Sequence, residues 1–412
     1  MYFYKDILHL DLEMSSLCNA KCPICNRRQQ GGPKNTSYKE TYLTLERLKK
    51  WLSKEFITQL YGLQICGNYG DAMTNPELID ILKYMTSINP GLHMTMNTNA
   101  SGRNEEFWTE LGKLFSPDHN ILTFSVDGLE DTNHIYRRGT HWPKIMNAMK
   151  WFVKAGGRAR WEYLVFKHNQ HQIEEAKQLA KDMGLVQFFA KEAMGFVNQP
   201  ITEGGVKYNS WMKVLDDEAR PEYFIERQDK TMNNNQIKLY LKEAGFTKSE
   251  EQSIDPDELA KKFNDPRAFY KPKMDKQIID NKRKLSPNEI ALGQTEINCI
   301  AIPRKGIFIG HDGLVFPCCF TASKYYANPS SFEVSQLQDF INAYGTRNIS
   351  LEYNSLETII NGPMFQGKWP DNFKSRDIRD KRLITCSLFC GKKTNHEFKK
   401  TKNSIKAERS LI

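Results

Sequence analysis

The stretch Leu17-Cys18-Asn19-Ala20-Lys21-Cys22-Pro23-Ile24-Cys25-Asn26 places three cysteines within eight residues. It follows residues 8–14, in which Leu8, Leu10, Leu12 and Met14 alternate with polar residues, as in a half-buried β-strand. A short loop at the end of a strand can offer three thiolates to a four-iron cluster, which leaves the fourth iron open to a non-protein ligand. The spacing therefore predicts an iron-sulfur site with a reactive iron.

Two other uses of these cysteines compete with a cluster. Structural zinc takes four ligands, usually as two Cys-x2-Cys pairs, whereas this loop has one such pair and a cysteine four residues upstream. Disulfides are disfavoured because nine cysteines is an odd number, and because the opening Met-Tyr-Phe-Tyr-Lys-Asp lacks the features of a signal peptide. We therefore expect metal binding in a reducing cytosol, and a cytoplasmic protein.

The whole chain has the composition of a globular protein. Its 412 residues, of which 40% are hydrophobic, suggest two or three domains with real cores. No apolar run approaches the ~20 residues that span a bilayer, so no membrane partner is expected. The net charge of +9 is concentrated near the end, in the basic tail 392–412. Such a tail can bind nucleic acid, but without aromatic interleaving a solvated terminus is the favoured interpretation.

Strand-like and helix-like segments alternate through the first 190 residues at the spacing of βα units. Strands are predicted at 8–14, 61–66, 93–97, 121–126, 160–166 and 186–190. Amphipathic helices are predicted after Asn75 and after Asn169, each asparagine acting as a cap. The alternation predicts an α/β fold with parallel strands.

The Cys-x3-Cys-x2-Cys loop and the six βα units together resemble the radical S-adenosylmethionine (radical SAM) superfamily. The resemblance implies a partial (β/α)6 TIM-like barrel, with the chemistry on loops at the carboxyl ends of the strands. It also implies a [4Fe-4S] cluster on Cys18, Cys22 and Cys25 that binds S-adenosylmethionine, with an electron donor such as flavodoxin or ferredoxin. One departure is Ile24, where the family usually has an aromatic residue.

The resemblance also implies a set of residues that bind the cosubstrate, each at a predicted strand end. After the second strand, Gly70 and Asp71 stand where the family has a glycine-rich segment ending in glutamate and proline, so Asp71 and Ala72 depart from that pattern. The remaining candidates are polar residues after the third and fourth strands: Asn97, Asn99, Ser125, Arg137 and Arg138. An arginine can bind the methionine carboxylate as a bidentate pair.

A second group of cysteines follows residue 298. The stretch 305–318 predicts a β-hairpin with Asp312-Gly313 as its turn, which brings Cys318 near Cys299. Cys386 and Cys390 share a face if their segment is helical. Four thiolates suit either an iron-sulfur cluster or structural zinc. Cys319 is held in reserve, since neighbouring residues in extended chain face opposite sides.

This second region resembles the SPASM and twitch extensions of the same superfamily, which carry auxiliary clusters. The resemblance implies a small α+β carboxyl-terminal iron-sulfur domain with one auxiliary [4Fe-4S] cluster on Cys299, Cys318, Cys386 and Cys390. The expected domains are a barrel at 1–193, a linker or insertion, partly helical, at 194–298, the auxiliary domain at 299–391 and the tail. Cys66 is interpreted as a small buried hydrophobe.

The functional hypothesis is a radical SAM enzyme that cleaves S-adenosylmethionine to a 5′-deoxyadenosyl radical and abstracts hydrogen from a substrate. Many relatives with this extension modify peptides, so the resemblance favours a peptide or protein substrate. Two alternatives stay open. The first is a radical SAM enzyme for a small molecule, sugar or nucleotide, and the second is a non-catalytic zinc or iron-sulfur protein that binds nucleic acid.

Overall fold

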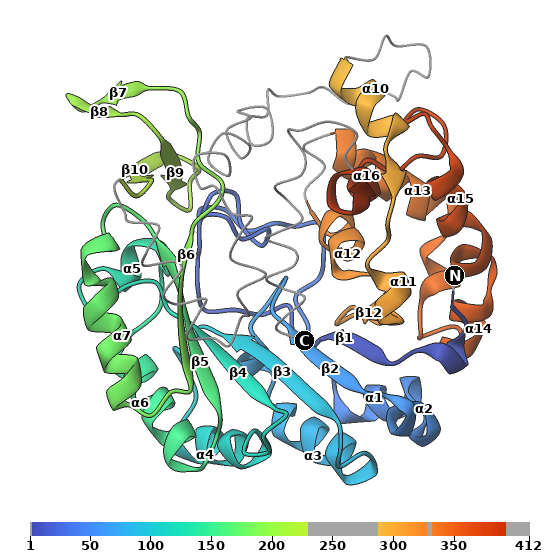
Figure 1. Ribbon diagram of the computed structural model, residues 1–412, viewed down its shortest axis with the longest axis horizontal. Coiled ribbons are helices and arrows are strands. Elements are labelled where there is room, and N and C mark those ends of the chain that lie inside the picture. The colour runs from blue at the N-terminus through green and yellow to red at the C-terminus, as the bar shows by residue number, and fades with distance from the viewer. Residues whose placement is uncertain (1, 230–286, 328–331, 393–412) are drawn as a thin grey trace, which may run out of the picture. The chain divides into compact units, whose positions relative to one another are not determined.

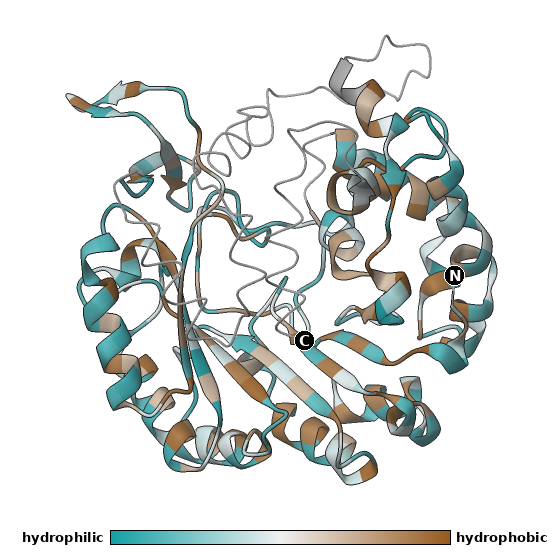
Figure 2. Cartoon of the chain, in the orientation of Figure 1, coloured by the Kyte–Doolittle hydropathy of each residue, from teal (hydrophilic) through white to brown (hydrophobic). Residues whose placement is uncertain are grey.

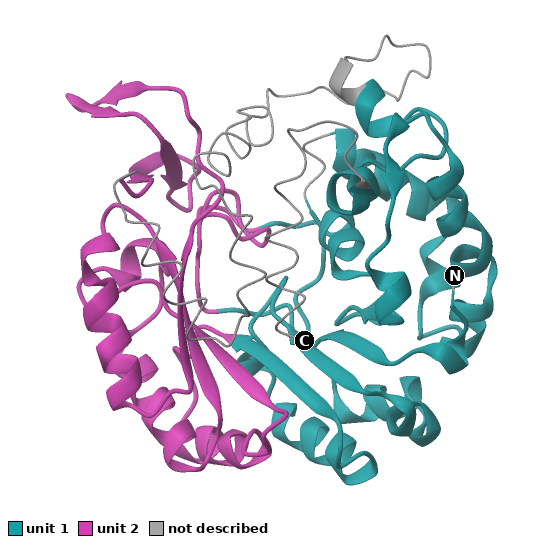
Figure 3. Ribbon diagram, viewed as in Figure 1, with its two compact units in different colours: residues 1–18, 35–97, 271–394 teal, residues 19–34, 98–270, 395–412 magenta. Residues whose placement is uncertain are grey.

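The computed structural model describes residues 2–229, 287–327 and 332–392 (Figure 1). The chain divides into two compact units (Figure 3). The first is built from 1–18, 35–97 and 271–394, and the second from 19–34, 98–270 and 395–412. The expected basic tail, apart from residue 392, lies outside the described residues, as does much of the expected insertion.

The first unit is built on a sheet with the strand order β13-β12-β1-β2-β3. Its parallel strands are β1 (His9–Glu13), β2 (Gly62–Cys66), β3 (His93–Thr98) and β12 (Gly306–Ile309). The antiparallel β13 (Val315–Phe316) completes the predicted hairpin with β12. Helices α1 (Leu45–Trp51), α2 (Lys54–Gln59) and α3 (Leu78–Ile88) connect the first three strands.

The core of this sheet comes from the alternation that the sequence displays. Apolar strand residues such as Ile65, Met94 and Met96 are fully buried, and the stripe Leu78, Ile81, Leu82 and Met85 of α3 is buried too. Figure 2 shows hydrophobic segments alternating with paler ones along β2 and β3. Between β2 and α3 the chain forms the short 3-10 helix η2 (Ala72–Thr74).

The later part of the first unit is mainly helical. Its elements are α10 (Pro287–Gln294), β11 (Glu296–Ile297), α11 (Ala301–Arg304), α12 (Cys319–Tyr325), α13 (Phe332–Tyr344), α14 (Leu356–Asn361), α15 (Trp369–Lys374), α16 (Ile384–Cys390) and β14 (Gly391–Lys392). Strands β11 and β14 pair antiparallel, with Ile297 opposite Gly391. This pairing brings two segments about ninety residues apart in the chain side by side.

The second unit contains the parallel strands β4 (Ile121–Ser125), β5 (Ala159–Val165) and β6 (Gln187–Glu192). Helices α4 (Glu105–Leu114), α5 (Asn133–Tyr136), α6 (Trp142–Lys154) and α7 (Ile173–Asp182) connect or flank them. Figure 1 shows α4, α6 and α7 along one side of these strands. Aromatic residues fill the space between, since Phe124, Phe152 and Trp161 are fully buried.

The fold class is therefore α/β, and the strands of its sheet are mostly parallel, as in the partial barrel of the expected family. All six predicted strands are present, and β1, for example, covers 9–13 where 8–14 was expected. The helix expected after Asn169 begins with a 3-10 turn at Gln170–Gln172 before α7. Among the described residues, no helix has the length and apolar character needed to cross a membrane.

The described part of 194–298 differs from the expected linker with some helix. Before α10 it forms two antiparallel hairpins, β7 (Ile201–Glu203) with β8 (Val206–Tyr208), and β9 (Trp211–Leu215) with β10 (Pro221–Glu226). Gly204 and Gly205 both have positive φ, at 55° and 79°. A Gly-Gly pair of this kind is a signature of a two-residue hairpin turn, and the many charges and prolines of the segment obscured it.

Candidate functional site

Two of the three clustered cysteines, Cys22 and Cys25, belong to the second unit, in a compact loop. The Cys25 amide donates to the Cys22 carbonyl at 3.1 Å, and the Arg28 amide donates to the Cys25 carbonyl at 3.0 Å. The Cys22 side chain is buried, whereas Cys25 is partly exposed. These consecutive turns keep the two cysteines close along the loop.

A guanidinium group faces the Cys22 thiol. Arg137 Nη1 lies 3.8 Å from Cys22 Sγ. Burial raises the pKa of Cys22 to about 11, and the charge of Arg137 acts against that rise. A cation at this distance favours the thiolate form, which is the form that binds metal. The donor chemistry of this loop therefore fits a metal centre.

Arg137 is held by a buried carboxylate that follows β4. Arg137 Nε donates to Asp127 Oδ2, and the amide of Leu164 donates to Asp127 Oδ1 at 2.6 Å. Asp127 is fully buried, and burial raises its pKa although Arg137 opposes the change. Asp127 was not among the residues singled out from the sequence, so its pairing with Arg137 is new information from the structure.

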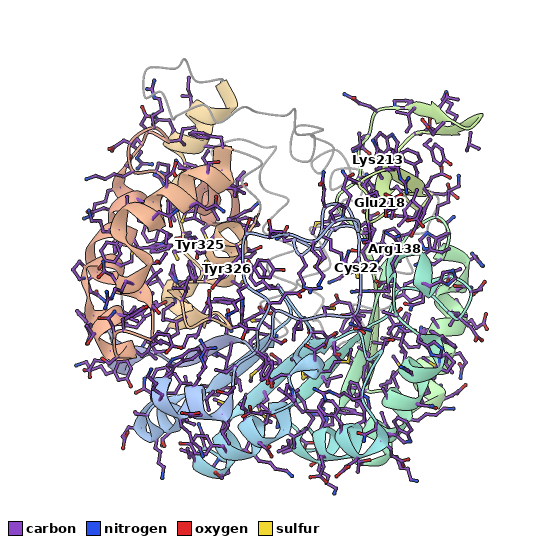
Figure 4. All side chains as sticks on the ribbon, turned by 180° about the vertical axis from the view of Figure 1, so that it is seen from behind. Cys22, Arg138, Lys213, Glu218, Tyr325 and Tyr326 are labelled. Atoms are coloured by element: carbon purple, nitrogen blue, oxygen red, sulfur yellow. The ribbon has the colours of Figure 1, made fainter. Side chains whose placement is uncertain are left out.

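Arg138 has different partners from its neighbour. Its Nη1 donates to the carbonyls of Gly31 and Leu215 at 3.2 and 2.8 Å, and its Nη2 forms an ion pair with Glu222. Figure 4 shows Arg138 and Cys22 near the β9–β10 hairpin, where Glu218 and Lys213 are labelled. The structure therefore joins Arg138 to this hairpin, while Arg137 joins Asp127 and Cys22.

The β9–β10 hairpin makes further contacts with the loop that carries Cys22 and Cys25. Asp217 forms ion pairs with Lys21 at 2.6 Å and with Arg28 at 2.9 Å. The amide of Leu215 also donates to the carbonyl of Gln30 at 3.0 Å. The β9–β10 hairpin, which lies in the segment expected to be a linker or insertion, thus supports the cysteine loop.

Cys18 belongs to the first unit, where Gly70 and Asp71 lie against the chain just before it. The Asp71 amide donates to the Leu17 carbonyl at 2.8 Å, and Asp71 Oδ1 caps η2 by accepting from the Met73 amide at 3.2 Å. A Cβ added to Gly70 would come within 2.0 Å of the Ser15 carbonyl oxygen. Only glycine allows this close approach, so both residues help to fix the backbone beside Cys18.

The other predicted cosubstrate residues lie at strand ends as expected. In the first unit, Asn97 is an exposed residue of β3. In the second unit, Asn99 donates to Asn19 Oδ1 at 3.1 Å and accepts from the Ser101 amide at 2.9 Å. Ser125 ends β4, opposite Glu162 of β5. Asn99 thus contacts the residue that directly follows Cys18.

The first unit also contains a buried carboxylate that sequence reasoning passed over. Glu13, the last residue of β1, is fully buried and accepts hydrogen bonds from the amides of Asn68 and Tyr69, each at 3.2 Å. Burial raises its pKa to about 8, although these amide hydrogen bonds act in the opposite direction. The signal was present in the sequence, because a glutamate inside a strand next to the cysteine loop is unusual.

The second cysteine set surrounds one small cavity in the first unit. Cys299, Cys318, Cys386 and Cys390 all line it, and the other lining residues are mainly apolar or aromatic, including Pro317, Trp369 and Phe389. The thiols of Cys299 and Cys390 are hydrogen-bonded, which with burial raises the pKa of Cys299. Burial raises the pKa of Cys318 to about 11. The four cysteines that the sequence grouped together therefore line the same cavity.

Local structure explains how the four residues meet. The β11–β14 pairing and the hydrogen bond from the Asn298 amide to the Cys390 carbonyl, at 2.6 Å, set Cys299 beside Cys390. Helix α16 presents Cys386 one turn before Cys390. Cys318 precedes α12 in an extended conformation, and Cys319 is the first helical residue. Cys319 does not line the cavity and interacts electrostatically with Cys66 and Arg304 instead.

Comparisons with known proteins agree with the family that the motif suggested. Residues 12–180 match the family model described as the radical SAM superfamily. That range includes Cys18, Cys22 and Cys25 and the strands β2–β5. A search of curated proteins found no match.

Among solved structures, Streptococcus suis SuiB bound to the precursor peptide SuiA aligns over 92% of this chain and 76% of that chain, with 12% identity and a TM-score of 0.47. SuiB alone aligns over 81% of this chain and 65% of that chain, with 14% identity and a TM-score of 0.43. For anSMEcpe with bound AdoMet the shares are 76% and 74%, with 15% identity and a TM-score of 0.38.

Proposed function

Because this chain belongs to the radical SAM superfamily of enzymes, we propose that Cys18, Cys22 and Cys25 hold its [4Fe-4S] cluster and that a peptide or protein is its substrate. Bound there, a reduced cluster would supply the one electron that cleaves S-adenosylmethionine into methionine and a 5′-deoxyadenosyl radical, which would abstract hydrogen from the substrate. The observation that carries the proposal is the contact of Arg137 with Cys22, because it gives a motif cysteine the cationic neighbour that a thiolate ligand needs.

The chain's own residues position the components. Gly70 and Asp71 fix the backbone beside Cys18, as their contacts with Ser15 and Leu17 indicate. Asn97, Asn99 and Ser125 are proposed to contact the cosubstrate from the strand ends that carry them. Arg138 is a weak candidate for this role, because its guanidinium is already bound to Glu222 and two carbonyls.

The second cysteine set is proposed to hold one auxiliary iron-sulfur cluster. The support is the convergence of Cys299, Cys318, Cys386 and Cys390 on one mostly apolar cavity. Four thiolates satisfy every iron of a four-iron cluster, so this site leaves no iron open for a cosubstrate. Its surroundings suit a cluster that transfers electrons or stabilises the fold.

The peptide or protein substrate is supported by the resemblance of the carboxyl-terminal cysteine pattern to the SPASM and twitch extensions. Isotope transfer distinguishes it from a small molecule, sugar or nucleotide. Peptide, sugar and nucleoside pools labelled with deuterium are each incubated with the reduced enzyme and S-adenosylmethionine. We expect deuterium in 5′-deoxyadenosine only with the peptide pool, and label from another pool alone would contradict the proposed substrate.

The enzymatic activity itself is tested without a substrate. Anaerobically reconstituted and reduced protein should convert S-adenosylmethionine to 5′-deoxyadenosine, and Cys22→Ala should abolish this reaction. The matched control is Cys66→Ala, which removes another buried cysteine and should retain the activity. Protein that contains zinc without iron or sulfide, or a Cys22→Ala variant that works at the parent rate, would overturn the assignment.

A further inference from the structure

Arg137 connects two groups of opposite character in the second unit. One end of its guanidinium, Nε, donates to the fully buried Asp127, and Nη1 approaches Cys22 Sγ at 3.8 Å. The Arg137 side chain is 18% exposed and Asp127 is 0% exposed. Both contacts therefore form in a region with little water, where charge interactions are stronger than at the surface.

The backbone around Arg137 restricts where the guanidinium can go. Arg137 follows α5 directly, and its amide donates to the Asn133 carbonyl at 2.8 Å. The side chain of Asn133 accepts from the Asp127 amide at 2.9 Å, so one residue links the backbones of both partners. The Arg137 guanidinium also lies over the Tyr136 ring, 5.4 Å from its centroid. The chain thus fixes both ends of the Asp127–Arg137 pair.

The two contacts give the arginine a definite electrostatic effect on the cysteine. Hydrogen bonds to ligand sulfurs and nearby charge are among the factors that set the reduction potential of an iron-sulfur cluster. Reduction adds a negative charge, which a fixed cation stabilises. Asp127 limits how far the guanidinium can move and leaves Nη1 directed at the sulfur.

We propose that Arg137 raises the reduction potential of the cluster that Cys22 would hold, because its positive charge is held against the Cys22 sulfur, and that Asp127 positions Arg137 for this contact. The inference rests on the proposed function, because it requires a cluster on Cys22. It gives Arg137 a role toward the cluster that is distinct from binding the methionine carboxylate, the role that the sequence suggested.

The test is a redox titration monitored by electron paramagnetic resonance, made on the full-length holoprotein without substrate. The signal of the first cluster is identified as the one that changes when S-adenosylmethionine is added. We compare the parent with Arg137→Gln, which keeps a hydrogen-bonding group and removes the charge, and with Arg137→Lys. The matched control is Arg160→Gln, which changes a half-buried arginine of the same unit that donates to Thr123 at 2.8 Å.

For Arg137→Gln we expect the ratio of reduced to oxidised cluster at a fixed potential to fall about tenfold, which corresponds to a negative shift of about 59 mV for one electron. Arg137→Lys should shift the potential less, since lysine keeps the positive charge but lacks the planar guanidinium that can contact two partners at once. Arg160→Gln should leave the potential unchanged. If Arg137→Gln assembles no cluster, the Arg137→Lys titration decides the question.

Several results would overturn the inference. One is a potential equal to that of the parent in both Arg137 variants, or in Arg137→Lys where only that variant assembles. Another is an equal shift in Arg160→Gln, which would indicate a general charge effect. A parent protein with no iron-sulfur signal would instead refute the proposed function, so the two failures are distinguishable.

Discussion

The two cysteine sets are built in opposite ways. Cys18, Cys22 and Cys25 lie within eight residues of chain, and the buried Cys22 faces the guanidinium of Arg137. The second set comes from three separate segments and lines a mostly apolar cavity with aromatic neighbours, among them the stacked rings of Phe320 and Phe389, 4.2 Å apart. The first set is local in sequence and has Cys22 in contact with a guanidinium, whereas the second is assembled by the fold around a mostly apolar cavity, with the charge of the buried Arg382 acting on Cys386.

This difference predicts that the two cysteine sets have different functions. Three cysteines in one loop leave a cluster with an open iron, which suits a site that must bind a cosubstrate. Four cysteines around a mostly apolar cavity would supply all four ligands of the proposed auxiliary cluster, which suits storage or transfer of electrons. If the comparison is correct, changes beside one set should leave the other intact.

The largest expected effect comes from removing half of the second set. The double variant Cys386→Ala, Cys390→Ala should lose about four of the eight irons expected for two four-iron clusters, because two of its four ligands are gone. It should still form 5′-deoxyadenosine from S-adenosylmethionine, since the first set is untouched. Iron and sulfide analysis with product quantification checks both results. An unchanged iron content, or loss of all iron, would contradict the separation of the two sites.

A pair of glycine substitutions sharpens the same comparison. A Cβ on Gly70 would meet the Ser15 carbonyl oxygen at 2.0 Å, and a Cβ on Gly391 would meet the Ser387 carbonyl oxygen at 2.3 Å. Each alanine therefore forces the backbone to shift. Overpacked sites commonly lose about 1–3 kcal/mol of stability in this way. Gly70→Ala should lower iron binding at the first set and Gly391→Ala at the second, as iron content and thermal unfolding will report.

Gly67→Ala is the control for this pair, because the nearest atom to its new Cβ would be the Gly70 carbonyl oxygen at an ordinary 3.4 Å. We expect it to match the parent in melting temperature and in iron content. The comparison between the two sets would fail if Gly391→Ala removed the first cluster, or if Gly67→Ala were as damaging as Gly70→Ala.

A smaller effect concerns the buried carboxylate next to the first set. Because burial raises the pKa of Glu13 from 4.5 to about 8, the folded protein binds a proton there that the unfolded chain has lost between these pH values. The stability that this group contributes is fully present below about pH 4.5 and is lost as pH rises through about 8. Between these two pH values, this group changes the free energy of unfolding by at most about 1.4 kcal/mol per pH unit.

Glu13→Gln should remove this slope, since the amide has no proton to lose and its oxygen can still accept from the Asn68 or Tyr69 amide. The free energy of unfolding, measured at several pH values between 5 and 8, gives this slope for each protein. Glu357→Gln, in α14 of the same unit, is a suitable control because Glu357 is exposed. A variant with the same pH slope as the parent would show that Glu13 is ionised in the native protein.

Local patterns in the sequence were enough to predict the parallel strands and to group the four later cysteines that line one cavity. The alternation of residues 8–14 predicted β1, and the Asp312-Gly313 turn predicted the hairpin that delivers Cys318. Local sequence patterns could not predict the contacts that distinguish the two sets. Arg137 meets Cys22 across 115 positions of chain, and Arg138 meets Glu222 across 84, so only the folded backbone brings them together.

The smallest expected effect tests how the first set depends on the β9–β10 hairpin. Asp217 pairs with Lys21 and Arg28 of the cysteine loop, but its side chain is 56% exposed, so salt should screen both pairs. In Asp217→Asn, hydrogen exchange of the 19–34 amides should rise slightly at low salt and equal that of the parent at about 1 M salt, where the Debye length is about 3 Å. Glu203→Gln, on the exposed β7 strand, should change nothing. A rise that persists at high salt would mean that Asp217 acts on the loop through something other than charge.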